Sequence, residues 1–146
     1  MMQSMEVDRN GLEVLDRDEC LRLLALVTLG RIGFTSGALP TVLPVNFHLD
    51  RERILVRTGR GSKLDVALQN AVVAFEVDDF DPIHHSGWSV AVTGVATEIS
   101  DPAELDAARR EPVARWAPAG DATVLAISTE LVSGRRITPA LLPTRR

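Results

Sequence analysis

The residues with the clearest chemical potential lie at positions 57–63, in the stretch RTGRGSK. Its two glycines let backbone N–H groups approach an anion closely, and Ser62 adds a hydroxyl. Arg57, Arg60 and Lys63 add positive charge, and cations combined with N–H donors suit a phosphate group. The spacing matches neither the Walker A pattern nor the G-x-G-x-x-G of dinucleotide sites. The stretch therefore predicts a phosphate held in some other way.

The flanking residues indicate how this stretch is positioned. An apolar run at 54–56 precedes it and predicts a strand, and the pattern at 64–68 predicts a helix. The order strand, glycine loop, helix start brings unpaired N–H groups toward an anion. Ser62 and Asp65 also fit a helix-capping pattern, so the loop could instead be a simple turn. From the residues alone, the two interpretations stay open.

Length and composition limit the class of protein. The chain has 146 residues, which predicts one domain, with 45% hydrophobic residues and a net charge of −4. An acidic chain argues against a general binder of nucleic acid or membrane surfaces. The single cysteine, Cys20, excludes an internal disulfide and is expected to be a buried thiol. No signal peptide and no apolar run of ~18 residues is visible, so we expect a cytoplasmic protein without a membrane span.

The elements predicted along the chain define the fold class. Residues 1–14 are expected to be loosely ordered, 15–138 to form the domain and 139–146 to be a tail. Residues 78–86 read as a loop, and Pro44 implies a sheet edge, a bulge or a barrel bend. The pattern predicts an α+β fold, a six-stranded antiparallel closed or split β-barrel with two or three short peripheral helices. Helices are expected at 16–27, 62–70 and 100–111, and strands at 32–35, 41–49, 53–58, 71–77, 88–99 and 123–137.

Several motifs together carry a resemblance to a known family. They are GRIGF at 30–34, PVNF at 44–47, the loop 57–63, GWSV at 87–90 and GRRI at 134–137. Their order and spacing resemble the pyridoxamine 5′-phosphate oxidase-like FMN-binding split-barrel family, and its short actinobacterial branch in particular. The resemblance covers residues 15–137. It implies an FMN-binding homodimer with two flavins at the subunit interface.

The resemblance also implies site residues. The phosphate and ribityl contacts would be Arg57, Thr58, Ser62 and Lys63. The segment along the isoalloxazine ring would be Pro44, Val45, Asn46 and Phe47. Trp88 and Ser89 match a strand that contacts the flavin from one or the other subunit. Asn46 could instead pair with backbone at a barrel bend, and Trp116 could wall the site or cover the core.

Departures from the family pattern bear on activity. True pyridoxamine phosphate oxidases carry a tryptophan in the last strand, whereas residues 130–133 contain no aromatic, and no arginine–histidine segment follows Arg136. The sequence shows no Ser/His/Asp arrangement, and His48, His84 and His85 read as surface residues, so a cofactor must carry any chemistry. We expect an FMN-dependent oxidoreductase acting on a small molecule. The alternatives are a deazaflavin-dependent reductase of the same fold, or a non-enzymatic flavin- or haem-binding carrier or sensor.

Overall fold

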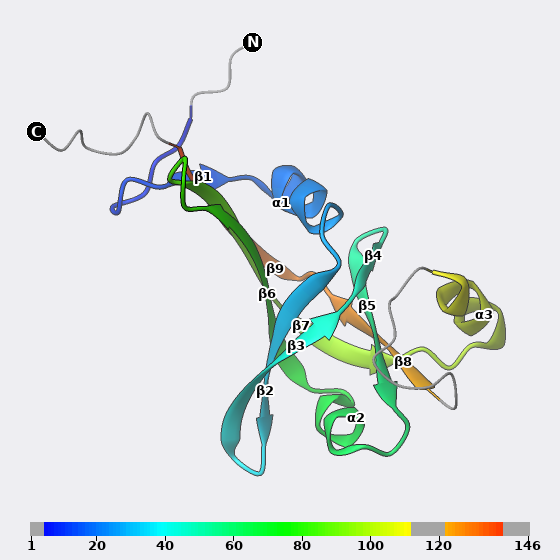
Figure 1. Ribbon diagram of the computed structural model, residues 1–146. Coiled ribbons are helices and arrows are strands. Elements are labelled where there is room, and N and C mark those ends of the chain that lie inside the picture. The colour runs from blue at the N-terminus through cyan, green and yellow to red at the C-terminus, as the bar shows by residue number, and fades with distance from the viewer. Residues whose placement is uncertain (1–4, 112–121, 139–146) are drawn as a thin grey trace, which may run out of the picture.

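The computed structural model describes residues 5–111 and 122–138. In these residues the helices are α1 (Arg17–Leu24), α2 (Lys63–Leu68) and α3 (Pro102–Arg110). The strands are β1 (Glu13–Leu15), β2 (Leu29–Ser36), β3 (Leu39–Asn46), β4 (His48–Asp50), β5 (Arg53–Gly59), β6 (Val72–Asp81), β7 (Ser86–Glu98), β8 (Ala122–Ser128) and β9 (Leu131–Ile137). All strand pairings among them are antiparallel, which confirms the predicted α+β class (Figure 1).

The prediction of six strands is wrong. Nine strands form one sheet in the described residues, and its main path runs β3-β2-β6-β7-β8-β5-β4, with β9 paired to β7 and β1 paired to β9. The path ends at β3 and β4, so the sheet does not close into a complete barrel. β3 is therefore an edge strand, which confirms one of the placements expected for Pro44.

The long strand β7 connects the two parts of this sheet. Its residues 87–93 pair with β9, whereas its last residues, 96–98, pair with β8. The partners change at Gly94, where an added Cβ would lie 1.8 Å from the carbonyl oxygen of Ser128. The Ser128 hydroxyl also accepts a hydrogen bond of 2.9 Å from the Val95 backbone. Glycine permits this close approach of two backbones because it has no side chain.

Local capping positions all three helices. Asp16, Ser62 and Asp101 each accept a hydrogen bond from the backbone N–H three residues further on, which at Ser62 is the capping pattern that the sequence predicts. Such caps satisfy N–H groups that the first turn of a helix leaves unpaired. α1 ends at Leu24 rather than near residue 27.

The core lies between the inner face of the sheet and α1 and α2. Cys20, Leu23 and Leu24 of α1 belong to it, and Phe47 and Phe75 meet edge to face with ring centroids 4.8 Å apart. A second, smaller cluster lies under α3 and joins Leu55, Ile99, Ala108 and Val124. The buried Cys20 confirms the expected inert thiol, since burial and then the Asp16 and Glu19 carboxylates raise the pKa of Cys20.

Three segments differ from the sequence-based expectation. Most of the predicted loop 78–86 belongs to a hairpin, because Asp78–Asp81 pair with Ser86–Ser89. The predicted strand 123–137 is two strands, β8 and β9, separated at Thr129 and Glu130. β1 begins at Glu13, inside the segment expected to be loosely ordered.

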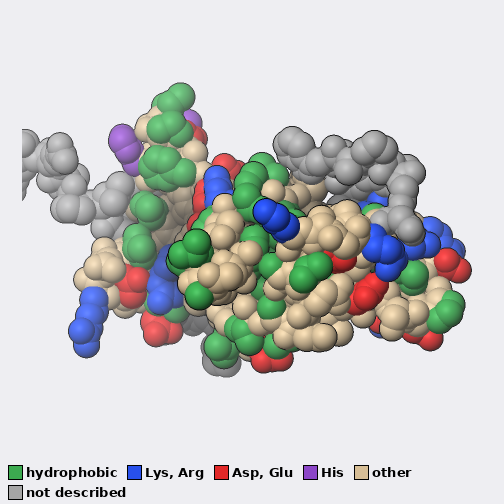
Figure 2. All heavy atoms as spheres, turned by 90° about the horizontal axis from the view of Figure 1, so that it is seen from below, with side chains coloured by type: hydrophobic (Ala, Val, Ile, Leu, Met, Phe, Trp, Pro, Cys, Tyr) green, Lys and Arg blue, Asp and Glu red, His purple; other side chains and the backbone are tan. Residues whose placement is uncertain are grey.

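The outer face of β3, β2, β6, β7 and β9 carries side chains that no helix of the described residues covers. One row across these strands joins Val42, Gly33, Ala74, Thr93 and Leu131. All of them except the half-buried Gly33 are exposed, including 66% of Val42 and 67% of Leu131. Seen from below, hydrophobic side chains also gather on the projecting hairpin that bears histidines (Figure 2). None of the helices in the described residues is long and apolar enough to cross a membrane.

Candidate functional site

The loop between β5 and α2 presents the predicted cationic group to solvent. Lys63 and Ser62 are exposed, and Gly61 adopts a left-handed φ of +74° that favours glycine. The Ser62 hydroxyl accepts a hydrogen bond of 3.1 Å from the Asp65 backbone N–H. The capping interpretation is thus confirmed, and it leaves the hydroxyl proton of Ser62 available to a ligand. α2 has only six residues, so the side chains rather than the helix dipole favour an anion here.

Two other predicted phosphate contacts point elsewhere. Thr58 is buried, and its hydroxyl donates to Asp65 Oδ1 at 2.9 Å. Arg57 lies on the opposite face of β5, where its Nη2 donates to the carbonyl oxygens of Arg109 (2.8 Å) and Glu111 (3.1 Å). A guanidinium at these carbonyls stabilises the C-terminal end of α3. The structure therefore brings Ser62 and Lys63 together at the surface, but not Thr58 and Arg57.

The predicted ring-contacting segment lies at the edge of the sheet. β3 contacts β5, whose end begins the loop. Pro44 and Asn46 belong to the outer face of β3, in register with Arg31 and Leu29 of β2. Phe47 is buried in the core, and its N–H donates to the Thr28 carbonyl at 2.9 Å. Its side chain thus packs inside the protein, while Val45 is partly buried against the same core.

Trp88 and Ser89 lie far from the loop within one chain. Trp88 is half-buried against the core, and Ser89 faces the outer side of the sheet beside Asp78 and Arg135. From Ser89 to Glu98, where β7 meets β8, the strand covers roughly 30 Å at the usual rise per residue. The loop lies beyond that point, since Gly59 pairs with Ala122 at the far end of β8. Trp116 lies outside the described residues.

Most basic side chains that could extend an anion site are paired within the chain. Arg135 Nε binds Asp8 at 2.9 Å, and Arg136 binds Glu19 at 2.5 Å. The salt bridges hold the pKa of Glu19 at about 2, with Arg22 as the first cause and Arg136 as the second. These arginines fasten β9 to the segment before β1 and to α1. Two further pairs are Arg31 with Asp78 (3.2 Å) and Arg60 with Glu98 (3.5 Å).

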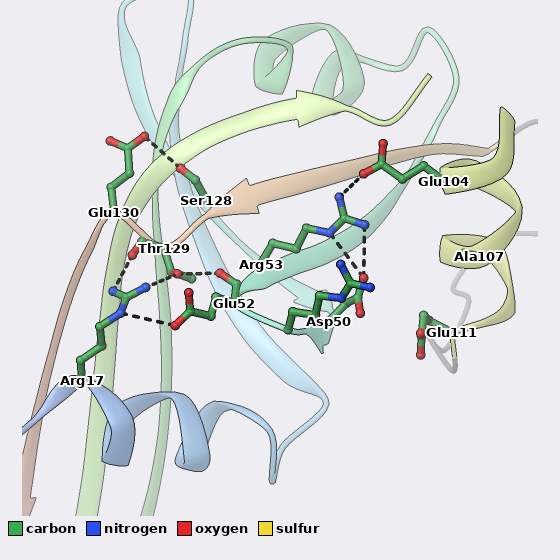
Figure 3. Close-up of a pocket in the computed structure, with 11 residues that line it drawn as sticks. Arg17, Asp50, Glu52, Arg53, Glu104, Ala107, Glu111, Ser128, Thr129 and Glu130 are labelled. Atoms are coloured by element: carbon green, nitrogen blue, oxygen red, sulfur yellow. Dashed lines mark hydrogen bonds and ion pairs between the residues drawn. The ribbon is translucent and has the colours of Figure 1, made fainter. Parts of the chain in front are cut away.

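A large cavity of about 760 Å³ lies at the opposite end of β5 from the loop, between α1, the β4–β5 hairpin and α3 (Figure 3). Its lining is highly charged, and its central arginines are already engaged. Arg53 binds Asp50 (3.2 Å) and Glu104 (2.5 Å), and Arg17 binds the carbonyl and hydroxyl oxygens of Thr129 at 2.7 and 2.9 Å. These contacts join α1 to the β8–β9 connection and α3 to the β4–β5 hairpin, so we regard the cavity as structural.

Sequence reasoning missed two groups. Asp65, noticed only as a capping partner, is a buried carboxylate under the loop. Glu76 lies on the uncovered face, between Arg31 (3.6 Å) and the Asp78 carboxylate. Burial and then Asp78 raise the pKa of Glu76 to about 7. The i, i+2 spacing of Glu76 and Asp78 on a strand was the signal that could have revealed their proximity.

Two histidine predictions can be placed on the structure. His84 and His85 are exposed on the β6–β7 turn, and His84 Nδ1 lies 2.5 Å from Asp81 Oδ2. His48 Nε2 lies 2.9 Å from Glu111 Oε2, at the end of α3. In the described residues, no group of three His, Cys, Asp or Glu side chains is arranged to hold a metal ion.

A comparison with known protein families shows to which family this chain belongs. The family model described as pyridoxamine 5′-phosphate oxidase matches residues 16–139. The chain belongs to the pyridoxamine 5′-phosphate oxidase-like family. The loop and the edge strand are thus the parts of this chain to compare with the flavin site expected for that family.

Comparison with individual proteins gives relatives consistent with this family. The uncharacterized protein Rv0080 of Mycobacterium tuberculosis is 45% identical over 128 aligned residues, and the match covers 84% of this chain and 84% of that one. The FAD binding protein of Mycobacterium smegmatis is 36% identical, with a TM-score of 0.77 over 86% of this chain and 98% of that one. A conserved protein of unknown function from Corynebacterium diphtheriae is 31% identical, with a TM-score of 0.72 over 86% and 97% of the two chains.

Proposed function

We propose that this protein binds a flavin nucleotide, with FMN as the simplest candidate, and acts as a flavin-dependent oxidoreductase on a small molecule. The observation that carries the proposal is the exposed pair Ser62 and Lys63 on the loop between β5 and α2, in a chain of this family. A hydroxyl and an ammonium on adjacent residues suit one phosphate group. These residues fit the cofactor, and so does the edge strand, whose Pro44 and Asn46 offer an apolar surface and an amide to a ring edge.

The pairing of the arginines favours a flavin over a deazaflavin. A deazaflavin with a long acidic tail needs a groove lined by unengaged cations. Arg135 and Arg136 instead hold the chain's own Asp8 and Glu19, and Arg57 holds the end of α3. A compact phosphate needs only the loop. A haem receives no support from His48, whose ring nitrogen is engaged by Glu111.

FMN and FAD differ in the adenylate group that FAD carries beyond the phosphate next to the ribityl chain. The Mycobacterium smegmatis relative, 36% identical, is an FAD binding protein, so FAD is the second candidate. Both share the ribityl phosphate that Ser62 and Lys63 would hold. The adenylate of FAD would need a further surface, and the exposed residues around α2, such as Val66, would lie next to it.

The protein's own contribution to chemistry would be binding and orientation. A bound flavin supplies hydride transfer at its N5 atom. Ser62 and Lys63 would fix the phosphate, while Asn46 would donate to or accept from the ring edge. Departures from the family pattern at 130–133 and after Arg136 direct the proposal away from pyridoxamine phosphate as substrate.

We further propose that the cofactor lies between two copies of the chain. Two observations support this: the uncovered outer face, with its exposed row from Val42 to Leu131, and the separation of Ser89 from the loop by more than roughly 30 Å of strand. A flavin held by the loop can meet Ser89 and Trp88 only if a second copy supplies them. Val42→Asp would bury a charge in such an interface and should yield monomers that retain little flavin, measured by sedimentation velocity with absorbance detection. A wild-type monomer with flavin bound would refute the shared site.

The decisive experiment is the identification of the bound chromophore. We expect the purified protein to show the two-band spectrum of an oxidised flavin and to release FMN or FAD on denaturation, identified by chromatography. Repeated reduction of that flavin by NADH or NADPH and its reoxidation by an acceptor would distinguish an oxidoreductase from a carrier. A protein that contains no flavin and binds neither added FMN nor FAD would disprove the proposal.

A further inference from the structure

Asp65 is the only carboxylate that is buried among the described residues, with 5% of its surface exposed. A buried charge is costly unless hydrogen bonds compensate it. Its place directly beneath a loop proposed to bind an anion is unexpected, because a negative charge there repels a phosphate. The residue therefore needs a reason beyond electrostatics.

The contacts of this carboxylate supply that reason. Oδ1 accepts hydrogen bonds from the Thr58 hydroxyl (2.9 Å) and the Gln69 side-chain amide (3.2 Å). Oδ2 accepts from the Gly61 backbone N–H (2.8 Å) and the Thr123 hydroxyl (3.3 Å). The four donors come from β5, the loop, the end of α2 and β8. One side chain thus joins β5, the loop, the end of α2 and β8.

The same residue also fixes the loop from its backbone. The Asp65 N–H donates to the Ser62 hydroxyl, and the Ser62 N–H donates to the Gly59 carbonyl at 3.0 Å. Gly61 is held at its left-handed φ of +74° while its N–H points to the carboxylate. These inward bonds leave the side chains of Ser62 and Lys63 exposed on the outer side.

We infer that Asp65 is a positioning residue for the flavin phosphate: its carboxylate shapes the loop so that Ser62 and Lys63 face the ligand together. The inference rests on the proposed function, since it concerns the same site. Asp65 touches no ligand in this role and acts through the loop alone. Burial by itself would raise the pKa of Asp65, but the bonds from Gly61, Thr58, Gln69 and Thr123 outweigh it and lower that pKa, so the group is charged at neutral pH.

The substitution Asp65→Asn separates positioning from electrostatics. An amide has one acceptor oxygen, so its NH₂ group would face two of the four donors and the loop would loosen. If the carboxylate acted only as a nearby negative charge, its neutralisation would tighten FMN. If it positions the loop, the same substitution weakens FMN, and the two roles predict opposite signs.

The test compares FMN and riboflavin affinity of the full-length apoprotein by flavin fluorescence titration. We expect Asp65→Asn to weaken FMN about tenfold or more and riboflavin less than about threefold. Thr58→Val, which removes one donor and keeps the carboxylate, should weaken FMN about fivefold; it decides the question if the Asp65 variant does not fold. Thr129→Val is the matched control, because this equally buried threonine donates to the Glu52 carbonyl (2.6 Å) at the other end of β5. It should leave the ratio of the two affinities unchanged.

The outcomes distinguish this inference from the proposed function. A wild-type protein that prefers FMN, together with Asp65→Asn and Thr58→Val variants that keep the same preference, would overturn the positioning role alone. Tighter FMN binding by Asp65→Asn would also overturn it. A wild-type protein that binds riboflavin as well as FMN would refute the phosphate site itself and the inference with it.

Discussion

The substitution Lys63→Ala tests the phosphate site most directly. It removes one exposed ammonium from the loop without touching the core or the cap. Two unit charges 4 Å apart interact by about 1 kcal/mol in water, and a phosphate monoester carries about −1.5 to −2. The exposed position of Lys63 keeps the interaction near this solvated limit, so we expect a loss of about 1.5–2 kcal/mol. That corresponds to an FMN dissociation constant about 10- to 30-fold higher.

Riboflavin is the internal control, because it has the same ring and no phosphate. The affinity for riboflavin should change by less than about twofold, because riboflavin carries no negative charge with which Lys63 could pair. Arg60→Ala is the matched variant. It deletes the same charge from the same loop, but Arg60 is engaged by Glu98 at 3.5 Å, so we expect a loss of less than about 1 kcal/mol for FMN. Ser62→Ala should cost about 1 kcal/mol of affinity, and about 1 kcal/mol of stability from the lost cap.

The assay is fluorescence titration of apoprotein at two salt concentrations, with melting temperatures recorded for each variant. At low ionic strength the Lys63 effect should grow, because salt screens exposed charges. An equal loss for FMN and riboflavin, or no loss for either, would show that Lys63 does not meet a phosphate. An Arg60 effect as large as that of Lys63 would mean that the loop acts only through its net charge.

Three further predictions concern the scaffold. Burial and Asp78 raise the pKa of Glu76 from 4.5 to about 7, so the stability that Glu76 contributes is lost as pH rises through that window. The loss should be less than about 1 kcal/mol, because 42% of the side chain is exposed. Glu76→Gln should abolish it, as thermal melts of both proteins at pH 5 and 8 would check. Gly94→Ala should destabilise by about 3 kcal/mol in urea unfolding, as its Cβ would lie 1.8 Å from a carbonyl oxygen. Gly33→Ala is the control: its Cβ would lie 3.5 Å from the nearest atom, so it should cost less than about 1 kcal/mol of stability. Equal costs for the two variants would contradict the close approach of the Gly94 and Ser128 backbones. The double change of His84 and His85 to alanine should leave flavin content unaltered, and loss of the chromophore would show a ligand role for the exposed turn.

The sequence alone determined the features that depend on neighbours within a few residues. Ser62 was recognisable as a cap because it bonds the Asp65 N–H three residues away. The glycine loop at 57–63 followed in the same way from turn-forming residues. The order of the predicted strands and helices indicated the α+β class, and the residue types of the loop drew attention to Ser62 and Lys63.

Only the tertiary structure decided which strands meet and which side chains remain for a ligand. β9 lies between β7 and β1, and Arg135 finds its partner Asp8 at 127 residues' separation. The Thr58 hydroxyl donates a hydrogen bond to Asp65, and the Phe47 side chain packs in the core. The predicted single strand 123–137 breaks at Thr129, whose hydroxyl binds the distant Glu52 carbonyl.

The physical reason for this division is the range of the interactions. A cap or a tight turn is satisfied by atoms that the chain itself holds close, so residue types at fixed spacing suffice to predict it. Strand pairing and the pairing of buried charges depend on which distant segments compete for the same donors and apolar surface. An arginine such as Arg57 looks the same in sequence whether it binds a phosphate or, as here, the carbonyl oxygens at the end of α3.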